Sequence, residues 1–195
     1  PTDEREWQDL TVIFATSLGN VRRNALADFT SIKANGKMAM KLEEEGERLI
    51  AVTTAGEDHD ILLATREGKC IRFPVGEVRV FAGRASTGVR GIRLASGDEV
   101  ISMSVLRHAE FDVEERDAFL KIAAQRRRAA EPEEAEPEEP VPALPEERFQ
   151  ALLAAEEFVL SVTSKGFGKR TSAYEYRVAG RGGQGIANIE TTERN

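Results

Sequence analysis

Short apolar runs recur along the chain, and each is followed by a polar turn and a second short run that ends in arginine. The pattern occurs three times, in VIFATSLGNVRR (Val12 to Arg23), ILLATREGKCIR (Ile61 to Arg72) and FVLSVTSKGFGKR (Phe158 to Arg170). The turn glycines, Gly19, Gly68 and Gly166, are separated by 49 and then 98 residues, so the second spacing is twice the first. This regular spacing indicates an internal repeat, and each copy predicts a β-hairpin.

Two further blocks complete the repeat. The second block is ANGKMAMKL (Ala34 to Leu42), STGVRGIRL (Ser86 to Leu94) or GQGIANIE (Gly183 to Glu190), and the third is GERLIAV (Gly46 to Val52) or GDEVISMSV (Gly97 to Val105). Alternation with a period of two is typical of a half-buried strand. The repeat therefore predicts about four short strands in each unit of about 50 residues. That pattern indicates an all-β, propeller-like fold.

The glycine-rich stretch TSKGFGKR, Thr163 to Arg170, permits two interpretations. Gly19 and Gly68 stand where a two-residue hairpin turn needs a positive φ, and Gly166 occupies the same place in its repeat. A phosphate-binding loop would need a following helix, and none is predicted here. The sequence favours a hairpin turn over a dedicated phosphate-binding loop.

The segment between the second and third repeats has a different composition. EERDAFLKIAAQRRRAA, Glu114 to Ala130, predicts a helix with acidic residues at its start and arginines at its end, as the helix dipole favours. EPEEAEPEEPVPALP, Glu131 to Pro145, is rich in Pro and Glu and predicts an extended linker. EERFQALLAAEEF, Glu146 to Phe158, predicts a short amphipathic helix.

These patterns predict one β domain, residues 1–105 and 158–195, interrupted by a largely helical and disordered acidic insert at residues 106–157. Residues 106–158 hold 15 acidic and 7 basic residues, a net charge of −8, so the net charge of −7 for the chain belongs to this segment. The global charge therefore does not exclude a nucleic-acid partner for the rest. Two roles stay open for the insert: a tolerated surface insertion, or an acidic mimic of DNA that competes for a basic surface.

The composition also limits the compartment. The 195-residue chain has one cysteine, Cys70, which allows no internal disulfide and fits a reducing compartment. No apolar run approaches the ~20 residues of a membrane span. The first ten residues, PTDEREWQDL, do not form a signal peptide, and the chain begins at Pro1 rather than Met, as an excerpt or a processed product would. We expect a cytoplasmic protein.

No residue set predicts catalysis or metal binding. His59 and His108 lack neighbours at metal-ligand spacing, and we expect both in connections between strands. Cys70 aligns with Val21 and Gly168 at a strand position and should be inert. Tyr174 and Tyr176 follow the third arginine-ended strand, where packing or stacking is favoured over a nucleophilic role.

Several segments resemble the C-terminal domain of the DNA gyrase A subunit. They are TGVRGIRL (Thr87 to Leu94), GFGKRT (Gly166 to Thr171) with AYEY behind it, and the terminal TERN (Thr192 to Asn195). The resemblance covers nearly all of the three repeats and not the insert. It implies a β-pinwheel, in which neighbouring blades exchange a strand, here with about three blades. It also implies a role in wrapping double-stranded DNA in a right-handed sense, so that the whole topoisomerase introduces negative supercoils.

The resemblance assigns chemistry and partners to other parts of the enzyme. ATP and Mg²⁺ would act on other domains, ATP being hydrolysed on the B subunit, so we expect no cofactor and no catalytic residue in this chain. The implied partners are DNA, the rest of a dimeric A subunit, and the B subunit. The family's box, Gln-Arg-Arg-Gly-Gly-Lys/Arg-Gly, has only a partial counterpart in AGRGGQG, Ala179 to Gly185. We interpret this stretch as the same loop in a later blade, with the box itself upstream of Pro1.

Repeated positive charge marks the candidate DNA-binding surface. Arg23, Arg72 and Arg170 are equivalent by spacing, and a ring of such cations around a disc would suit phosphates irrespective of base sequence. The candidate DNA-binding residues are Arg22, Arg23, Lys37, Lys69, Arg72, Arg84, Arg90, Arg93, Lys165, Lys169, Arg170 and Arg181. Three alternatives stay open: solvated strand faces without a ligand, the C-terminal domain of the topoisomerase IV A subunit, and a propeller-like protein-interaction scaffold with arginines on both faces.

Overall fold

The computed structural model describes residues 3–30, 33–42, 44–129 and 143–192. The chain divides into two compact units. Unit 1 comprises Pro1–His108, Ser161–Lys169 and Arg177–Asn195, and unit 2 comprises Ala109–Leu160 and Arg170–Tyr176. Most of the predicted Pro/Glu-rich linker and the last three residues of TERN lie outside the described residues.

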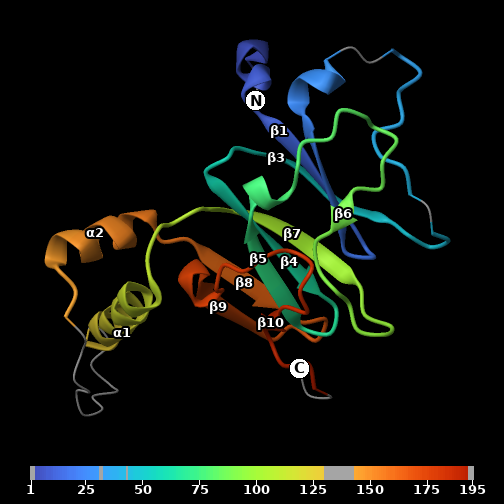
Figure 1. Cartoon of the computed structure of the whole chain (residues 1–195). Helices are drawn as coiled ribbons and strands as arrows, with labels where there is room; N and C mark the ends of the chain where they lie inside the picture. The colour runs from blue at the N-terminus through green and yellow to red at the C-terminus, as the bar shows by residue number, and fades with distance from the viewer. Residues whose placement is uncertain (1–2, 31–32, 43, 130–142, 193–195) are drawn as a thin grey trace. The chain divides into compact units, whose positions relative to one another are not determined.

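All three predicted hairpins are present (Figure 1). Their strands are β1 (Thr11–Thr16) with β2 (Asn20–Ala25), β4 (His59–Thr65) with β5 (Lys69–Pro74), and β8 (Phe158–Val162) with β9 (Gly168–Ser172). Each second strand leads into a short 3-10 helix: η2 (Leu26–Phe29), η3 (Val75–Glu77) or η4 (Ala173–Glu175). Another such helix, η1 (Glu4–Gln8), precedes β1.

Three residues separate the strands in the first two turns, whereas the sequence predicted two. In the third, five residues separate the strands, but the Thr163 amide donates to the Phe167 carbonyl oxygen over 2.7 Å, so this turn also encloses three. In the first turn, the Gly19 amide donates to the Thr16 carbonyl oxygen over 3.0 Å, and the Asn20 amide donates to Thr16 Oγ1 over 3.3 Å. Thr65 and Thr163 accept the same two bonds in the other turns. The turn glycines have φ angles of 81°, 78° and 84°, the left-handed conformation that closes a three-residue hairpin loop. Gly166 is therefore a turn glycine, as predicted.

Neighbouring repeats share strands. The first four-stranded sheet has the order β3-β1-β2-β6 and the second has the order β10-β5-β4-β7, while β8 and β9 form a two-stranded sheet. The added strands are β3 (Leu49–Ala55), β6 (Val89–Arg90), β7 (Val100–Arg107) and β10 (Ile186–Ala187). Strand β6 comes from the second repeat and β10 from the third, so each four-stranded sheet takes one edge strand from the repeat that follows it.

Backbone hydrogen bonds hold the following repeat at both ends of each complete hairpin. At the turn, the Gly19 carbonyl oxygen accepts from the amides of Gly91 and Ile92 over 2.8 and 3.2 Å. At the other end, the Arg23 carbonyl oxygen accepts from the Phe81 amide over 2.7 Å. The second hairpin repeats these contacts with the third repeat, through the carbonyl oxygens of Gly68 and Arg72. The repeats are therefore joined by backbone pairing as well as by apolar packing.

The predicted strand in the second block is short or absent. Only Val89–Arg90 and Ile186–Ala187 are strands, and Ala34–Leu42 contains none. In this last segment Met40 is buried while Met38 and Leu42 are exposed, so the predicted alternation is wrong here. The reason is the missing partner. β6 and β10 pair with the hairpin of the preceding repeat, whereas Ala34–Leu42 belongs to the first repeat in the part of the chain that the structure describes.

The main core of unit 1 lies between the two four-stranded sheets. Ile13 and Val21 of the first sheet pack with Ile61, Leu63 and Phe73 of the second in one buried cluster. Ile92 and Val100 from the later blocks of the second repeat join it. The turn glycines belong to this packing, because a Cβ at Gly19 would lie 2.9 Å from the Ile92 carbonyl oxygen.

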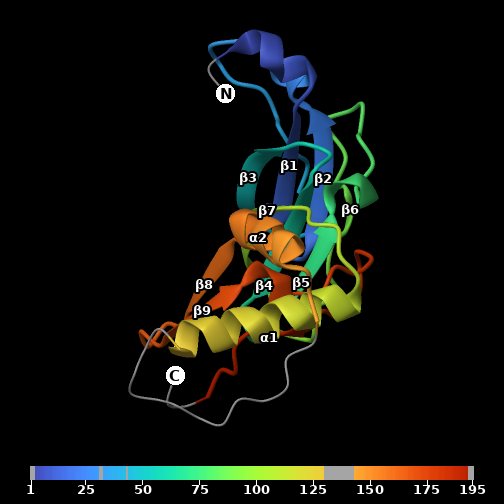
Figure 2. The ribbon, with the colours of Figure 1, turned by 90° about the vertical axis from the view of Figure 1, so that its left-hand side faces the viewer.

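Unit 2 contains the two predicted helices, α1 (Val113–Ala129) and α2 (Glu146–Ala155), drawn in yellow and orange in Figure 2. Phe119 of α1 and Phe149 of α2 pack with a ring-centroid separation of 5.2 Å. Arg126 binds Glu146 through both carboxylate oxygens, and this bond, with the Gln150 amide, lowers the pKa of Glu146 from 4.5 to about 2. No helix in the described ranges is long and apolar enough to cross a membrane.

Tyr174 of η4 belongs to the same core. Its ring packs edge-on against Phe111 and Phe119, and its hydroxyl donates to the Leu152 carbonyl oxygen over 2.9 Å. Tyr176 is also buried. Packing or stacking was predicted for both tyrosines, and both are packed in the interior. The first two repeats have Ala27 and Gly76 at the position of Tyr174, so this residue is specific to the repeat that carries the helices.

Candidate nucleic-acid interface

The three equivalent arginines have different surroundings. Arg23 and Arg72 are buried, whereas Arg170 is exposed. Arg23 Nε donates to Thr11 Oγ1 over 3.0 Å, and Arg72 Nε donates to Asp60 Oδ2 over 2.8 Å. The Arg170 guanidinium lies 3.6 Å from the centre of the Phe158 ring. Thr11, Asp60 and Phe158 are themselves equivalent, each eight residues before the turn glycine. These arginines therefore share a place in the hairpin, where each contacts the start of the first strand.

Asp60 is the centre of a buried polar cluster. Its carboxylate accepts from Arg72 and lies 2.8 Å from Nδ1 of His108, while Arg72 also donates to the Arg107 carbonyl oxygen over 3.1 Å. His108 follows β7, as expected for a connection. His59 was also expected in a connection, but it is the first residue of β4 and is half-buried. The cluster ties the end of β7 to the second hairpin and leaves Arg72 no free donor face.

Arg22 is fully buried without a carboxylate partner in the described ranges. Its NH1 group donates to the carbonyl oxygens of Arg84 and Ser86 over 2.5 and 2.8 Å, and its NH2 group donates to that of Ala39. Its guanidinium stacks on Phe14 at 4.7 Å, and burial lowers its pKa. Arg22 therefore joins the first repeat to the second from inside the protein.

Three of the twelve candidates are thus not placed to contact DNA in this structure. The prediction that Arg22, Arg23 and Arg72 lie on a basic rim is corrected, because their guanidinium groups are buried and bonded within unit 1. The regular spacing of Arg23, Arg72 and Arg170 along the sequence reflects a contact that recurs in each hairpin, between the arginine of the second strand and the start of the first strand. Alternation alone cannot distinguish an outward arginine from an inward one that is bonded within the protein.

Arg84 and Arg181 occupy equivalent loops before β6 and β10 and are partly exposed. Arg181 donates to the carbonyl oxygens of Glu77 and Arg90 over 2.9 and 3.1 Å, and so links the third repeat to the second. The Arg84 guanidinium lies 5.7 Å from the centre of the Phe29 ring. Both side chains combine a structural contact with partial access to solvent.

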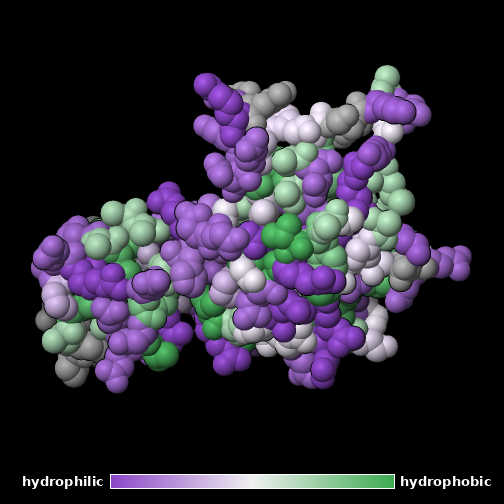
Figure 3. Space-filling model, turned by 45° about the horizontal axis from the view of Figure 1, so that its top comes forward, coloured by the Kyte–Doolittle hydropathy of each residue, from purple (hydrophilic) through white to green (hydrophobic). Residues whose placement is uncertain are grey.

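The remaining candidates of unit 1 are exposed: Lys37, Lys69, Arg90, Arg93, Lys165 and Lys169. Within the described ranges, Lys69, Arg90, Arg93 and Lys169 make no ion pair. An unpaired exposed cation is free to meet a phosphate without first losing a carboxylate partner. The face drawn in Figure 3 is mainly hydrophilic, with smaller apolar areas between the polar side chains.

Two further exposed arginines were not among the predicted DNA-binding residues. Arg79 and Arg177 are exposed, are 98 residues apart, and directly precede Val80 and Val178, the residues that bridge to Arg23 and Arg72. The Arg79 guanidinium stacks on Phe81 at 4.0 Å. Their spacing equals that of the turn glycines, so a search of the whole repeat for equivalent cations would have found them.

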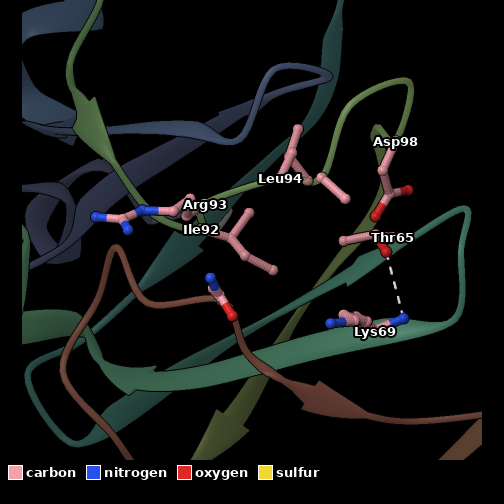
Figure 4. Close-up of a pocket in the computed structure, with 8 residues that line it drawn as sticks. Thr65, Lys69, Ile92, Arg93, Leu94 and Asp98 are labelled. Atoms are coloured by element: carbon pink, nitrogen blue, oxygen red, sulfur yellow. Dashed lines mark hydrogen bonds between the residues drawn. The ribbon is translucent and has the colours of Figure 1, made fainter.

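A small pocket of about 140 Å³ lies beside the second turn in unit 1 (Figure 4). Lys69 and Thr65 line it from the hairpin, Arg93 and Asp98 from the later blocks of the second repeat, and Gln184 from the third repeat. The Asp98 carboxylate caps the turn, because its Oδ1 accepts from the amides of Glu67 and Glu99 over 3.0 and 2.8 Å. No cluster of metal-ligating side chains is found in the described part of the chain.

Cys70 is the expected inert thiol. It is buried in β5, and burial raises its pKa from 9.0 to about 11, while nearby Lys169 lowers it slightly. A thiol held in its protonated form is a poor nucleophile.

The fold and its repeated cations define a β-propeller domain, and the comparisons place it in a family. The family described as "DNA gyrase C-terminal domain, beta-propeller" matches residues 11–55, 59–107 and 157–194. The chain belongs to this family. The matched ranges are the three repeats, and residues 108–156 lie outside them.

The curated relatives are named as the A subunit of DNA gyrase. The protein of Granulibacter bethesdensis is 54% identical over 100% of this chain and 22% of its own length. The protein of Rickettsia bellii is 47% identical over 100% of this chain and 21% of its own length. The protein of Staphylococcus aureus is 36% identical over 97% of this chain and 16% of its own length. The chain spans about a fifth of the length of the first relatives.

Two solved structures share the fold at low sequence identity. The C-terminal domain of DNA topoisomerase IV superimposes with a TM-score of 0.64 at 16% identity, covering 96% of this chain and 43% of that one. The DNA gyrase A C-terminal domain superimposes with a TM-score of 0.60 at 17% identity, covering 92% and 43%. At these identities the likeness concerns the fold.

Proposed function

We propose that this chain wraps double-stranded DNA as part of the A subunit of DNA gyrase, a type II topoisomerase. The observation that carries the proposal is the family match over all three repeats. The exposed, unpaired cations of unit 1 support it. On this proposal the finer architecture is a β-pinwheel of about three blades from residues 1–105 and 158–195, with residues 106–157 as an acidic insert.

Wrapping DNA makes non-covalent contacts and breaks no covalent bond. Cations that contact phosphates release counterions, which favours binding irrespective of base sequence. Bending DNA around a small domain costs about 1–6 kcal/mol for a site of 20–30 base pairs, and the added phosphate contacts offset that cost. A right-handed wrap would present a nearby segment of the same DNA for strand passage by the rest of the enzyme.

The remaining steps belong to parts of the enzyme outside this chain. Strand cleavage, ATP hydrolysis on the B subunit and Mg²⁺ binding would use other domains, in a cytoplasmic enzyme with a dimeric A subunit. The role left to this chain is to fix the path and hand of the DNA, so it needs no cofactor. Its net effect is the introduction of negative supercoils by the holoenzyme.

Binding across a salt series tests the proposal. Anisotropy of labelled duplexes of about 20 and about 150 base pairs, titrated with the full chain, should show tighter binding to the long duplex and a steep salt dependence. Closing nicked circles with ligase in the presence of the chain should then trap a positive change in linking number, because a right-handed wrap stores positive writhe. No binding to either duplex would contradict the proposal and favour the interaction scaffold.

The A subunit of topoisomerase IV is the alternative that a specific observation supports, namely the superposition with a TM-score of 0.64. That likeness has 16% identity, whereas the curated relatives at 36–54% identity bear the gyrase name. The linking-number experiment separates the two. Tight binding with little trapped writhe would favour the topoisomerase IV role.

A further inference from the structure

Two cross-strand pairs join each complete hairpin to the strand it receives from the next repeat. In the first sheet Asn20 of β2 pairs with Arg90 of β6, and in the second Lys69 of β5 pairs with Ala187 of β10. Asn20 and Lys69 each follow a turn glycine directly, and Arg90 and Ala187 each lie two residues after the loop glycine, Gly88 or Gly185. We call Asn20–Arg90 and Lys69–Ala187 the exchange pairs.

Each exchange pair holds one cation, but on opposite strands. The first pair carries it on the received strand, as Arg90, and the second on the hairpin, as Lys69. Directly opposed residues of an antiparallel pair lie on the same face with Cβ atoms about 5 Å apart. A long basic side chain on either strand therefore reaches the same place outside the blade. Both cations are exposed and make no ion pair in the described ranges.

The surroundings of the pairs favour an anion. Arg181 donates to the Arg90 carbonyl oxygen over 3.1 Å, and Arg93 lines the same pocket as Lys69. Two nearby carboxylates, those of Glu47 and Asp98, are buried and already bonded. Glu47 accepts from Asn20 Nδ2 over 3.3 Å, and Asp98 accepts from two backbone amides.

We propose that each exchange pair contacts one phosphodiester of the wrapped DNA, through whichever partner carries the cation. The inference rests on the proposed function and assigns its contact point in each blade. It also explains why one cation suffices in each pair, since a second at about 5 Å would add repulsion without reaching a new phosphate. The contact point exists only where one repeat has received a strand from the next, so the number of contacts follows the number of docked repeats.

Moving a charge across one pair tests this directly. The variants are Arg90→Ala, Lys69→Ala, the double variant, and the transfer variant Lys69→Ala with Ala187→Lys. Ala187 is exposed and pairs with Lys69, so the transfer keeps the net charge and moves it to the opposite strand. Lys121→Ala, which removes an exposed lysine of α1 in unit 2, is the matched control for charge.

The measurement is the slope of log binding constant against log salt for the full chain and a long duplex. Each single variant should lose about 0.9 from the magnitude of the slope, and the double variant about 1.8, because each phosphate contact contributes about 0.9. The transfer variant should return to the parent slope, while Lys121→Ala stays there. Circular dichroism checks that these surface changes leave the fold intact.

The outcomes separate the two proposals. A parent chain that does not bind DNA contradicts the proposed function itself. A parent that binds, with single variants no different from Lys121→Ala, overturns the exchange-pair contact and leaves wrapping in place. The exchange-pair contact is also overturned if the salt slope falls in the Lys69→Ala variant and does not recover in the transfer variant, because the contact would then require lysine on β5.

Discussion

The second and third hairpins have the same turn and different surroundings. Strand β4 is buried along most of its length, whereas β8 is largely exposed. Leu62 is 3% exposed, and its equivalent Leu160 is 71% exposed. A Cβ at Gly68 would lie 2.0 Å from the Ile189 carbonyl oxygen, whereas one at Gly166 would meet nothing within 4 Å. The difference lies in the neighbouring strands, because β7 of the same repeat pairs with β4 and β10 of the following repeat pairs with β5. Among the described residues, β8 and β9 pair only with each other.

The comparison separates what a hairpin determines alone from what its neighbour determines. The turn, its threonine and the positive φ of the glycine occur in every copy. Among the described residues, the apolar face and the arginine are buried in the two hairpins that have a further strand of their own repeat on one side and a strand of the next repeat on the other. The hairpin is thus a local unit, and the blade is completed by its successor.

The arginine that ends each hairpin gives the first test. Arg72→Met should destabilise unit 1 by about 3–5 kcal/mol, because it leaves the buried Asp60 carboxylate without its main partner. Arg170→Met removes only a stacking contact with Phe158 and should cost about 0.5–1 kcal/mol. In urea unfolding, the fluorescence of Trp7, the chain's one tryptophan, reports on unit 1 for Arg72→Met, and circular dichroism of the helices at 222 nm reports on unit 2 for Arg170→Met. Equal effects would show that burial does not distinguish the two positions.

Tyr174 gives the second test, since it stands where the complete hairpins have Ala27 and Gly76. Tyr174→Ala should destabilise the helices of unit 2 by about 3 kcal/mol through loss of its packing against Phe111 and Phe119. Tyr174→Phe keeps the ring and should cost only about 1 kcal/mol for the lost bond to Leu152. Thermal melting at 222 nm measures the helices. An unchanged melt for Tyr174→Ala would exclude the tyrosine as their anchor.

Much of this architecture was predictable because it is local. The spacing of Gly19, Gly68 and Gly166 predicted three hairpins, and the dipole pattern of Glu114–Ala130 predicted α1 to within a residue at each end. Long-range facts were not predictable in the same way. The sequence could not show that Arg22, Arg23 and Arg72 turn inward, because their acceptors, such as the Arg84 and Arg107 carbonyl oxygens, come from distant segments. Ala34–Leu42 failed as a strand for the related reason that its pattern specifies a partner that the described chain does not provide.

The turn glycines give the third test. Alanine in the left-handed conformation costs about 1–2 kcal/mol at either Gly68 or Gly166. Gly68→Ala must also displace the Ile189 carbonyl and weaken the two amide bonds to the Gly68 oxygen, for a total of about 2–4 kcal/mol. Gly166→Ala should cost only the conformational term. Urea unfolding of the two variants side by side measures the difference, and equal costs would mean that the turn does not support docking of the next repeat.

Thiol reactivity gives the mildest test, because it leaves stability almost unchanged. Cys70 of β5 and Gly168 of β9 are equivalent, and Cys70 is buried while Gly168 is exposed. In the Gly168→Cys variant at pH 8, an aromatic disulfide reagent should react in two phases. The introduced thiol should react as an ordinary one, whereas Cys70, with its pKa raised to about 11, should have ~100-fold less thiolate and react more slowly still because it is shielded. The slow phase should become fast above the urea midpoint of unit 1, since unfolding removes the burial that raises the pKa. Two fast phases in the native chain would mean that the third repeat does not remain docked on β5, and the contrast between the hairpins would then be a matter of degree.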